Sequence, residues 1–77
     1  ELDSDAYQKR AAAKAKLGKL ESALQDYSSA IDKSPLNAEL YRKRIEICKQ
    51  IGQQQLIDAD EQFLQVYENP AQHMRKP

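Results

Sequence analysis

The sequence consists of two similar units in tandem, and this repetition constrains the fold more than any other feature of the chain. A shift of 34 positions pairs Tyr7 with Tyr41, Arg10 with Arg44, Leu17 with Ile51 and Gly18 with Gly52. The later part of each unit pairs at 36 positions instead, which brings Leu20 onto Leu56, Ala23 onto Ala59, Tyr27 onto Phe63 and Ile31 onto Tyr67. We therefore expect two extra residues in the second turn, where added length costs little chain entropy. A period of this size indicates stacked supersecondary units.

Hydrophobic periodicity predicts the element type within each unit. Apolar residues recur at three- and four-residue steps, which is typical of amphipathic helices. No segment alternates apolar and polar residues with period two, so no sheet is expected. The predicted helices span residues 4–17, 20–33, 38–51 and 55–68.

Residues that favour turns and helix ends separate these helices. Gly18 and Gly52 can adopt the left-handed conformation that ends a helix. Pro35 stops the second helix, because the residue before a proline avoids the helical region. Ser4 and Asn37 are the expected N-caps.

The predicted fold class is all-α, with two tandem helix–turn–helix repeats whose four antiparallel helices form a short α-solenoid. One domain is expected over residues 1–70, with the first repeat at about 4–36 and the second at about 37–70. Residues 71–77 are expected to form a flexible tail.

One motif in each unit resembles the tetratricopeptide repeat. That family has Trp-x2-Leu-Gly-x2-Tyr, then Ala-x3-Phe, then Pro. The two units read Tyr7-x2-Arg10-Ala11-x2-Lys14, Ala23-x3-Tyr27, Pro35 and Tyr41-x2-Arg44-Ile45-x2-Cys48, Ala59-x3-Phe63, Pro70. The run over residues 7–18 is similar to repeats of co-chaperone members, which often carry arginine where the general pattern has leucine.

The resemblance implies how the units pack. Ala11 and Ala23 are small where the two helices of the first unit cross. Ile45 replaces a small residue and is expected to loosen the second crossing. Arg10 and Arg44 are expected to lay their stems on the core and keep their charged ends in water.

The charges are segregated although twelve Lys and Arg balance twelve Asp and Glu. The first helix of each unit and the turn at 18–19 hold nine bases: Lys9, Arg10, Lys14, Lys16, Lys19, Arg42, Lys43, Arg44 and Lys49. The same segments hold Asp5, Glu39 and Glu46. The second helices hold seven acids, Glu21, Asp26, Asp32, Asp58, Asp60, Glu61 and Glu68, and one base, Lys33.

In tetratricopeptide proteins the first helices line a concave groove, so the resemblance implies a groove of positive potential that attracts acidic ligands. The groove residues expected to bind a partner are Lys9, Lys16, Arg42, Lys43 and Lys49. The predicted function is protein–protein interaction, as a scaffold or co-chaperone fragment that holds an acidic segment. The alternative is a solvated face on which acids of the second helices pair with bases of the first.

A heat-shock chaperone is one candidate partner, because some co-chaperones of this family grip a chaperone's acidic C-terminal tail. The chain departs from that clamp, since Asp5 or Glu39 stands where a base is needed. Chaperone binding through another surface stays open.

Self-assembly is a second hypothesis. Repeat arrays usually need three or more units and a polar cap. The last helix carries more apolar residues than one neighbour covers, and the possible assembly face, which would also serve in a homo-oligomer, comprises Leu56, Phe63, Leu64 and Tyr67. RNA binding by helical repeats is a third hypothesis, which the zero net charge disfavours.

Catalysis, metal binding and cofactors are not expected. Cys48 is interpreted as a helical packing residue, and His73 lies in the tail without a metal-binding partner. No apolar run approaches a membrane span. A lone cysteine is weakly typical of a reducing, cytoplasmic compartment.

Overall fold

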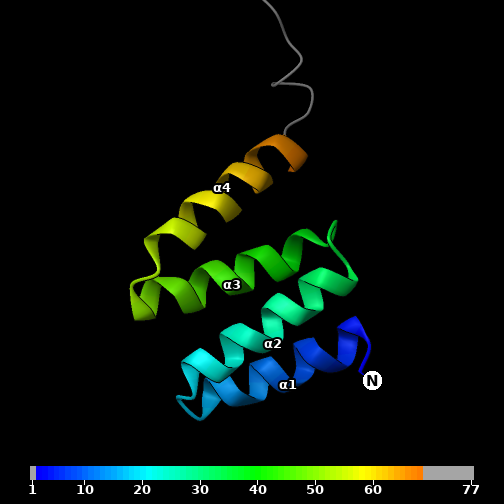
Figure 1. The fold of residues 1–77 in the computed structure, drawn as a ribbon, viewed down its shortest axis with the longest axis vertical. Coiled ribbons are helices and arrows are strands. Elements are labelled where there is room, and N and C mark those ends of the chain that lie inside the picture. Colours follow the sequence, from blue (N-terminus) through cyan, green and yellow to red (C-terminus); the bar gives the residue numbers. More distant parts are fainter. Residues whose placement is uncertain (1, 69–77) are drawn as a thin grey trace, which may run out of the picture.

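The computed structural model describes residues 2–68, and every regular element in this range is a helix. The helices are α1 (Ser4–Lys16), α2 (Leu20–Lys33), α3 (Ala38–Ile51) and α4 (Gln54–Glu68). Figure 1 shows them following one another across the molecule, each antiparallel to the one before it. The predicted all-α fold of two tandem helix–turn–helix repeats is confirmed. The predicted tail at 71–77 lies outside the described residues.

The first helix begins at Ser4, as predicted, but its N-cap is the residue before it. Asp3 is the N-cap of α1, and its carboxylate accepts a hydrogen bond of 2.8 Å from the Ala6 amide. The prediction of Ser4 as N-cap is therefore wrong. The Ser4 hydroxyl instead donates to the Ala30 carbonyl at 3.1 Å, which ties the start of α1 to the end of α2. Asn37 caps α3 as predicted, accepting from the Glu39 amide at 3.1 Å.

Both glycines end a helix in the left-handed conformation, as predicted. Gly18 has φ +80° and Gly52 has φ +79°. After α1, the Lys19 amide donates to the Lys14 carbonyl at 2.9 Å and the Gly18 amide donates to the Ala15 carbonyl at 3.0 Å. These bonds satisfy carbonyls that the helix itself leaves open.

The second half of each repeat keeps the spacing of the first half, so the predicted slip of two residues is wrong. Helices α2 and α4 begin at Leu20 and Gln54. Ala23 is fully buried, and its counterpart in the second unit, Ile57, is 6% exposed. Ala59, which the slipped alignment would bury, is exposed. The turn before α4 contains no extra residue, so α4 docks through the same helical positions as α2.

The helices of the two units cross through residues of different size. Ala11 and Ala23 are both fully buried in the first unit. Their counterparts Ile45 and Ile57 are also buried, 8% and 6% exposed, and form a second cluster with Cys48. Two alanines allow closer approach of the backbones than two isoleucines, so the second crossing is filled by larger side chains.

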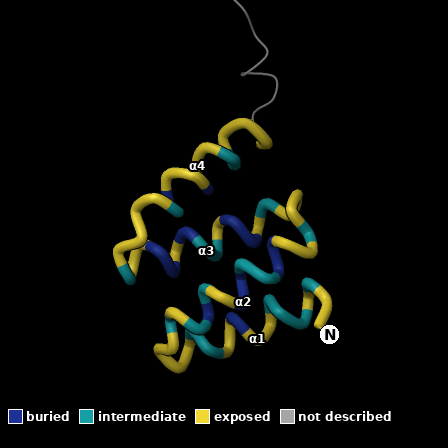
Figure 2. Tube along the Cα trace, in the orientation of Figure 1, coloured by how far each residue is buried: buried dark blue, intermediate teal, exposed yellow. Residues whose placement is uncertain are grey.

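Helix α3 lies in the middle of the core and is buried on two faces. Leu40 and Ile47 pack with Tyr27, Ala30 and Ile31 of α2. The opposite face, with Ile45 and Cys48, packs against Ile57 of α4. Figure 2 shows this concentration of buried residues in α2 and α3, while most of α4 is exposed.

Candidate functional site: a lysine-rich face above buried charge pairs

A charged pair joins the two helices of the first unit. Arg10 donates from Nε and Nη2 to the two carboxylate oxygens of Asp26, each at 2.8 Å. Lys14 adds a contact of 3.0 Å to the same carboxylate. The Asp26 side chain is only 6% exposed, whereas that of Arg10 is 50% exposed. We call this arrangement, and its counterpart below, an Arg–Asp tie.

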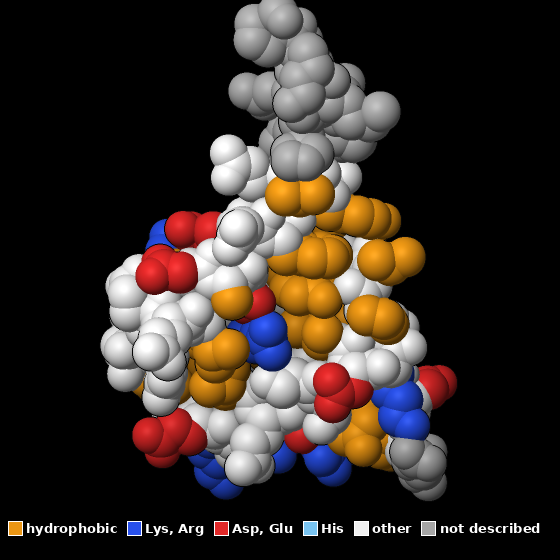
Figure 3. All heavy atoms as spheres, turned by 45° about the horizontal axis from the view of Figure 1, so that its top comes forward, with side chains coloured by type: hydrophobic (Ala, Val, Ile, Leu, Met, Phe, Trp, Pro, Cys, Tyr) orange, Lys and Arg blue, Asp and Glu red, His pale blue; other side chains and the backbone are white. Residues whose placement is uncertain are grey.

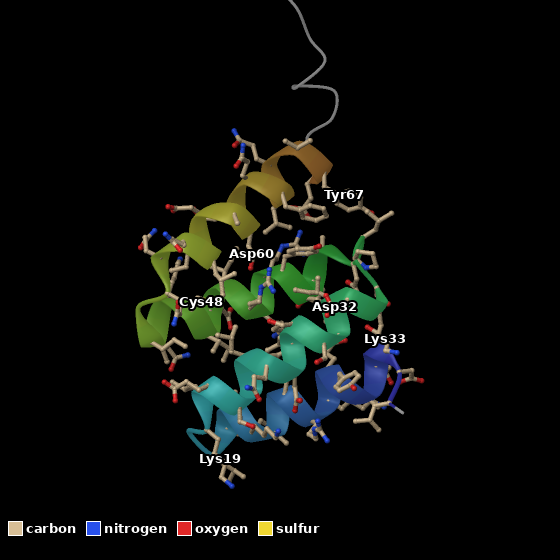
Figure 4. All side chains as sticks on the ribbon, in the orientation of Figure 1. Lys19, Asp32, Lys33, Cys48, Asp60 and Tyr67 are labelled. Atoms are coloured by element: carbon tan, nitrogen blue, oxygen red, sulfur yellow. The ribbon has the colours of Figure 1, made fainter. Side chains whose placement is uncertain are left out.

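The second unit contains the equivalent Arg–Asp tie at the matching positions. Arg44 donates to Asp60 at 2.7 and 2.6 Å, and Figure 4 shows Asp60 pointing from α4 toward α3. The remaining nitrogen, Nη1, donates to the hydroxyl of Ser28 on α2 at 3.1 Å. The Arg44 side chain is 14% exposed, so the prediction of a solvated charged end is wrong for Arg44. Its burial is supported by hydrogen bonds from all three guanidinium nitrogens.

Each tie also includes the tyrosine three residues before the arginine. The Arg10 guanidinium carbon lies 5.7 Å from the Tyr7 ring centre, and that of Arg44 lies 5.8 Å from the Tyr41 ring centre. Such distances permit cation–π attraction. In the motif Tyr-x2-Arg, the guanidinium group therefore lies between a tyrosine ring of its own helix and an aspartate of the next helix.

Sequence reasoning did not identify either tie. The signal was present, because Arg10 precedes Asp26 by the same sixteen residues that separate Arg44 from Asp60. The slipped alignment concealed it by placing Asp26 opposite Gln62. An aspartate on an amphipathic helix is also assigned to the solvated face by default.

The first tie lowers the pKa of Asp26. Hydrogen bonding to Arg10 lowers the pKa of this carboxyl to about 2, burial opposes the change, and Lys14 adds to it. The carboxylate therefore stays ionised in any ordinary buffer.

Part of the charge segregation is structural. Arg10 and Lys14 pair with Asp26, Arg44 pairs with Asp60, and Arg42 pairs with Glu68. The interpretation in which acids of the second helices pair with bases of the first therefore holds for these residues. The remaining bases on α1 and α3 define the candidate site.

The five predicted groove residues differ in how they are engaged. Lys9 contacts Asp5 at 3.2 Å on its own helix, and both side chains are largely exposed. Lys43 contacts Glu39 at 3.9 Å. Arg42 contacts Glu39 at 3.4 Å and also reaches Glu68 on α4, so it is the most engaged of the set.

Lys16 and Lys49 are exposed and make no ion pair with the described residues. Glu46 is exposed on the same helix as Lys49. Lys43 and Lys49 are six positions apart on α3, so they lie toward opposite edges of its exposed side. We use the term lysine face for the exposed sides of α1 and α3 that carry Lys9, Lys16, Lys43 and Lys49. Its positive charge is reduced by Asp5, Glu39 and Glu46, so it is weaker than a count of bases on the two helices indicated.

The predicted assembly face is partly covered. Phe63 stacks on Tyr41 at a centroid distance of 4.0 Å and on Tyr67 at 5.3 Å. Leu56 and Leu64 are partly buried against the second cluster. Tyr67 and Val66 are 44% and 46% exposed. Figure 3 shows hydrophobic side chains gathered beside the C-terminal end of α4.

Cys48 lies inside the protein with its side chain fully buried. Burial raises the pKa of this thiol, with Asp60 adding to the effect and Arg44 opposing it. The thiol therefore stays protonated at neutral pH, which makes it a poor nucleophile.

Other features of the described residues do not add to the site. A shallow hollow between the start of α1 and the end of α2 is lined by Leu2, Asp3, Ser4, Asp5, Lys33 and Ser34. Residues 2–68 contain no group of three or more possible metal ligands. Within that range, every helix is too short or too polar to cross a membrane. Each buried side-chain nitrogen or oxygen there has a hydrogen-bond partner.

Comparison with known protein families, curated proteins and solved structures gives no match to this chain.

Proposed function

We propose that this protein is a helical-repeat interaction module of the tetratricopeptide type, which holds an acidic segment of another protein along α1 and α3. The observation that carries the proposal is the exposure of Lys16 and Lys49 without an ion-pair partner among the described residues. The Arg–Asp ties support the proposal. Arg10, Lys14 and Arg44 are paired within the ties, so the bases of α1 and α3 that stay exposed are mainly those of the lysine face. A protonated, buried Cys48 also favours binding over catalysis, and it fits a reducing, cytoplasmic setting.

The engaged lysines remain available to a ligand. Lys9 and Asp5 form an exposed pair on one helix, and such pairs contribute about 0–1 kcal/mol. A ligand carboxylate can therefore take the place of Asp5 at small cost. Lys43 and Glu39 are separated by 3.9 Å, a still looser contact. The acidic tail of a heat-shock chaperone is one ligand of suitable chemistry.

Titration with an acidic peptide tests the proposal. We expect the double variant Lys16→Glu/Lys49→Glu to weaken binding by about tenfold, since two ligand contacts are reversed in sign. Raising the salt concentration should weaken binding of the unaltered protein by screening the same contacts. Fluorescence anisotropy of a labelled peptide gives both affinities.

A matched control comes from Lys19, which Figure 4 shows at the turn between α1 and α2, pointing away from the helices. Lys19→Glu also reverses a lysine charge but lies off the lysine face, so its effect should be less than about twofold. A loss in this control as large as that in the double variant would mean that net charge, and not the lysine face, governs binding.

Self-association through the end of α4 is the second candidate function. It is favoured by the exposure of Val66 and Tyr67 beside the stack of Phe63 on Tyr41. Light scattering over a wide concentration range tests it, with Tyr67→Ser as the variant expected to reduce association. A protein that stays monomeric at the highest concentration removes this candidate.

A further inference from the structure

The outer face of α1, turned away from α2, carries apolar side chains that the described residues leave uncovered. Leu2 and Leu17 are 37% and 72% exposed. Ala13 is exposed and Ala6 is half-buried. Ala6, Ala13 and Leu17 follow one another at steps of seven and four residues, so they share one side of α1. Leu2 lies just before the N-cap Asp3, at the start of the helix. Ala11, which faces α2, lies on the opposite side and is fully buried.

The repeat shows what covers this face in the second unit. The equivalent positions there are Leu36, Leu40, Ile47 and Ile51. Leu40 and Ile47 are 0% and 4% exposed, and they pack in one cluster with α2. Ile51 is partly buried against the same cluster, while Leu36, which precedes the helix, stays exposed. On α3 this face is therefore where the preceding helix docks.

The hydrogen bonds of Arg10 and Arg44 show the same difference between α1 and α3. Nη1 of Arg44 donates to Ser28, a residue of the helix that precedes α3. Arg10 uses Nε and Nη2 for Asp26, and its Nη1 has no hydrogen-bond partner among the described residues. The Arg10 side chain is 50% exposed, against 14% for Arg44. Within residues 2–68, helix α1 thus has neither the apolar nor the hydroxyl partner that α2 gives to α3.

A second copy of this chain is poorly suited to cover the outer face of α1. Helix α2 receives α3 through Leu24, Tyr27 and Ile31. The equivalent positions of α4 are Asp58, Glu61 and Gln65, which are exposed and polar, so α4 offers no matching surface. Two α1 faces set antiparallel would bring the Arg10 side chains of both copies together at the centre, where like charges repel.

We propose that the outer face of α1 is a docking surface for one amphipathic helix with the pattern of α2, placed before α1 as α2 is placed before α3. The residues that lead into α1 support this placement. Leu2 and Asp3 precede α1 as Leu36 and Asn37 precede α3, and both Asp3 and Asn37 cap their helix through a side-chain oxygen. The docked helix contributes large apolar residues and a serine or threonine hydroxyl that accepts from Arg10.

An extended variant tests the proposal. A copy of residues 20–35 replaces Glu1, so the copied Pro35 is followed by Leu2 as the original is followed by Leu36. We expect the midpoint of thermal unfolding to rise by about 5 °C or more, because the added helix buries the outer face of α1. In the extended chain Leu17→Asp should lower that midpoint by several degrees. In the unextended chain the same change should shift it by only about 1 °C, because surface substitutions have small effects.

The matched control carries the same extension with its copies of Leu24, Tyr27 and Ile31 changed to Asp, Glu and Gln, the residues that α4 has at these positions. It should melt at about the temperature of the unextended chain. An extended chain no more stable than this control overturns the proposal. So does a dimer of the unextended chain that Leu17→Asp dissociates, since the occupant would then be a second copy.

Discussion

Asp60 shows how a buried charge is tolerated in so small a core. Its side chain is 2% exposed, and both oxygens accept short hydrogen bonds from Arg44. Bringing two charges out of water is costly, and a well-packed apolar pair is often at least as stable. Removing one partner is far worse, because the other charge is left buried and uncompensated. The tie therefore fixes the relative position of α3 and α4 more than it adds net stability.

We expect Asp60→Asn to lower the free energy of unfolding by about 3 kcal/mol, because Arg44 loses its counter-charge. Chemical denaturation followed by circular dichroism measures the loss. Asp58→Asn is the matched control on the exposed side of the same helix, and it should change stability by about 0.5 kcal/mol or less. Similar losses in the two variants would show that the tie is not buried in solution.

The lowered pKa of Asp26 predicts a pH dependence. The folded-state value is about 2 and the ordinary value is 3.8. Between these values the unfolded chain binds more protons than the folded one, so stability falls as the pH falls. We expect the thermal midpoint to drop between pH 4 and pH 2 and to be flat above pH 5 as far as this group is concerned. In Asp26→Asn the drop should be smaller, and an unchanged profile in that variant would contradict this assignment.

At the scale of the helices, sequence periodicity predicted the elements well but not the docking of α4. Its apolar residues include Leu56, Ile57, Phe63 and Leu64, so the stripe is wide enough to fit either repeat spacing. Asp60 decides between them, and an aspartate does not register as a core residue in any hydrophobic pattern. The exposure of Lys9, Lys16 and Lys49 was predictable from helix positions, whereas the Arg–Asp ties depend on which acids the fold buries.

A pair of substitutions separates the two spacings. Ala23→Leu should cost about 1–3 kcal/mol, because Ala23 is fully buried at the crossing with α1 and the added carbons overpack it. Ala59→Leu should cost about 0.5 kcal/mol or less, because Ala59 is exposed. Urea denaturation of both variants makes the comparison. Equal losses of stability in the two variants would mean that Ala59 is buried like Ala23, which would support the 36-residue alignment.

At the scale of the whole molecule, α3 couples the two repeats. It is buried against α2 on one face and α4 on the other, and Arg44 bonds to both neighbours. Neither repeat keeps a complete core when the other unfolds. The first repeat would lose the α3 residues that cover α2, and the second would lose the α2 residues that cover α3.

We therefore expect a single cooperative unfolding transition. Helix content, followed by far-ultraviolet circular dichroism, and tyrosine fluorescence should give coincident denaturation curves. Separate midpoints would mean that the repeats unfold independently. Ser28→Ala, which removes the bond across the repeat boundary, should lower the common midpoint without splitting it, at a cost of about 1–2 kcal/mol.

Each Arg–Asp tie lies within one repeat unit, since Arg10 pairs with Asp26 and Arg44 with Asp60. This has a consequence for inheritance. A genetic duplication or deletion of one unit carries each buried carboxylate together with the arginine that neutralises it. Gain or loss of a whole unit would therefore leave no unpaired charge in the core.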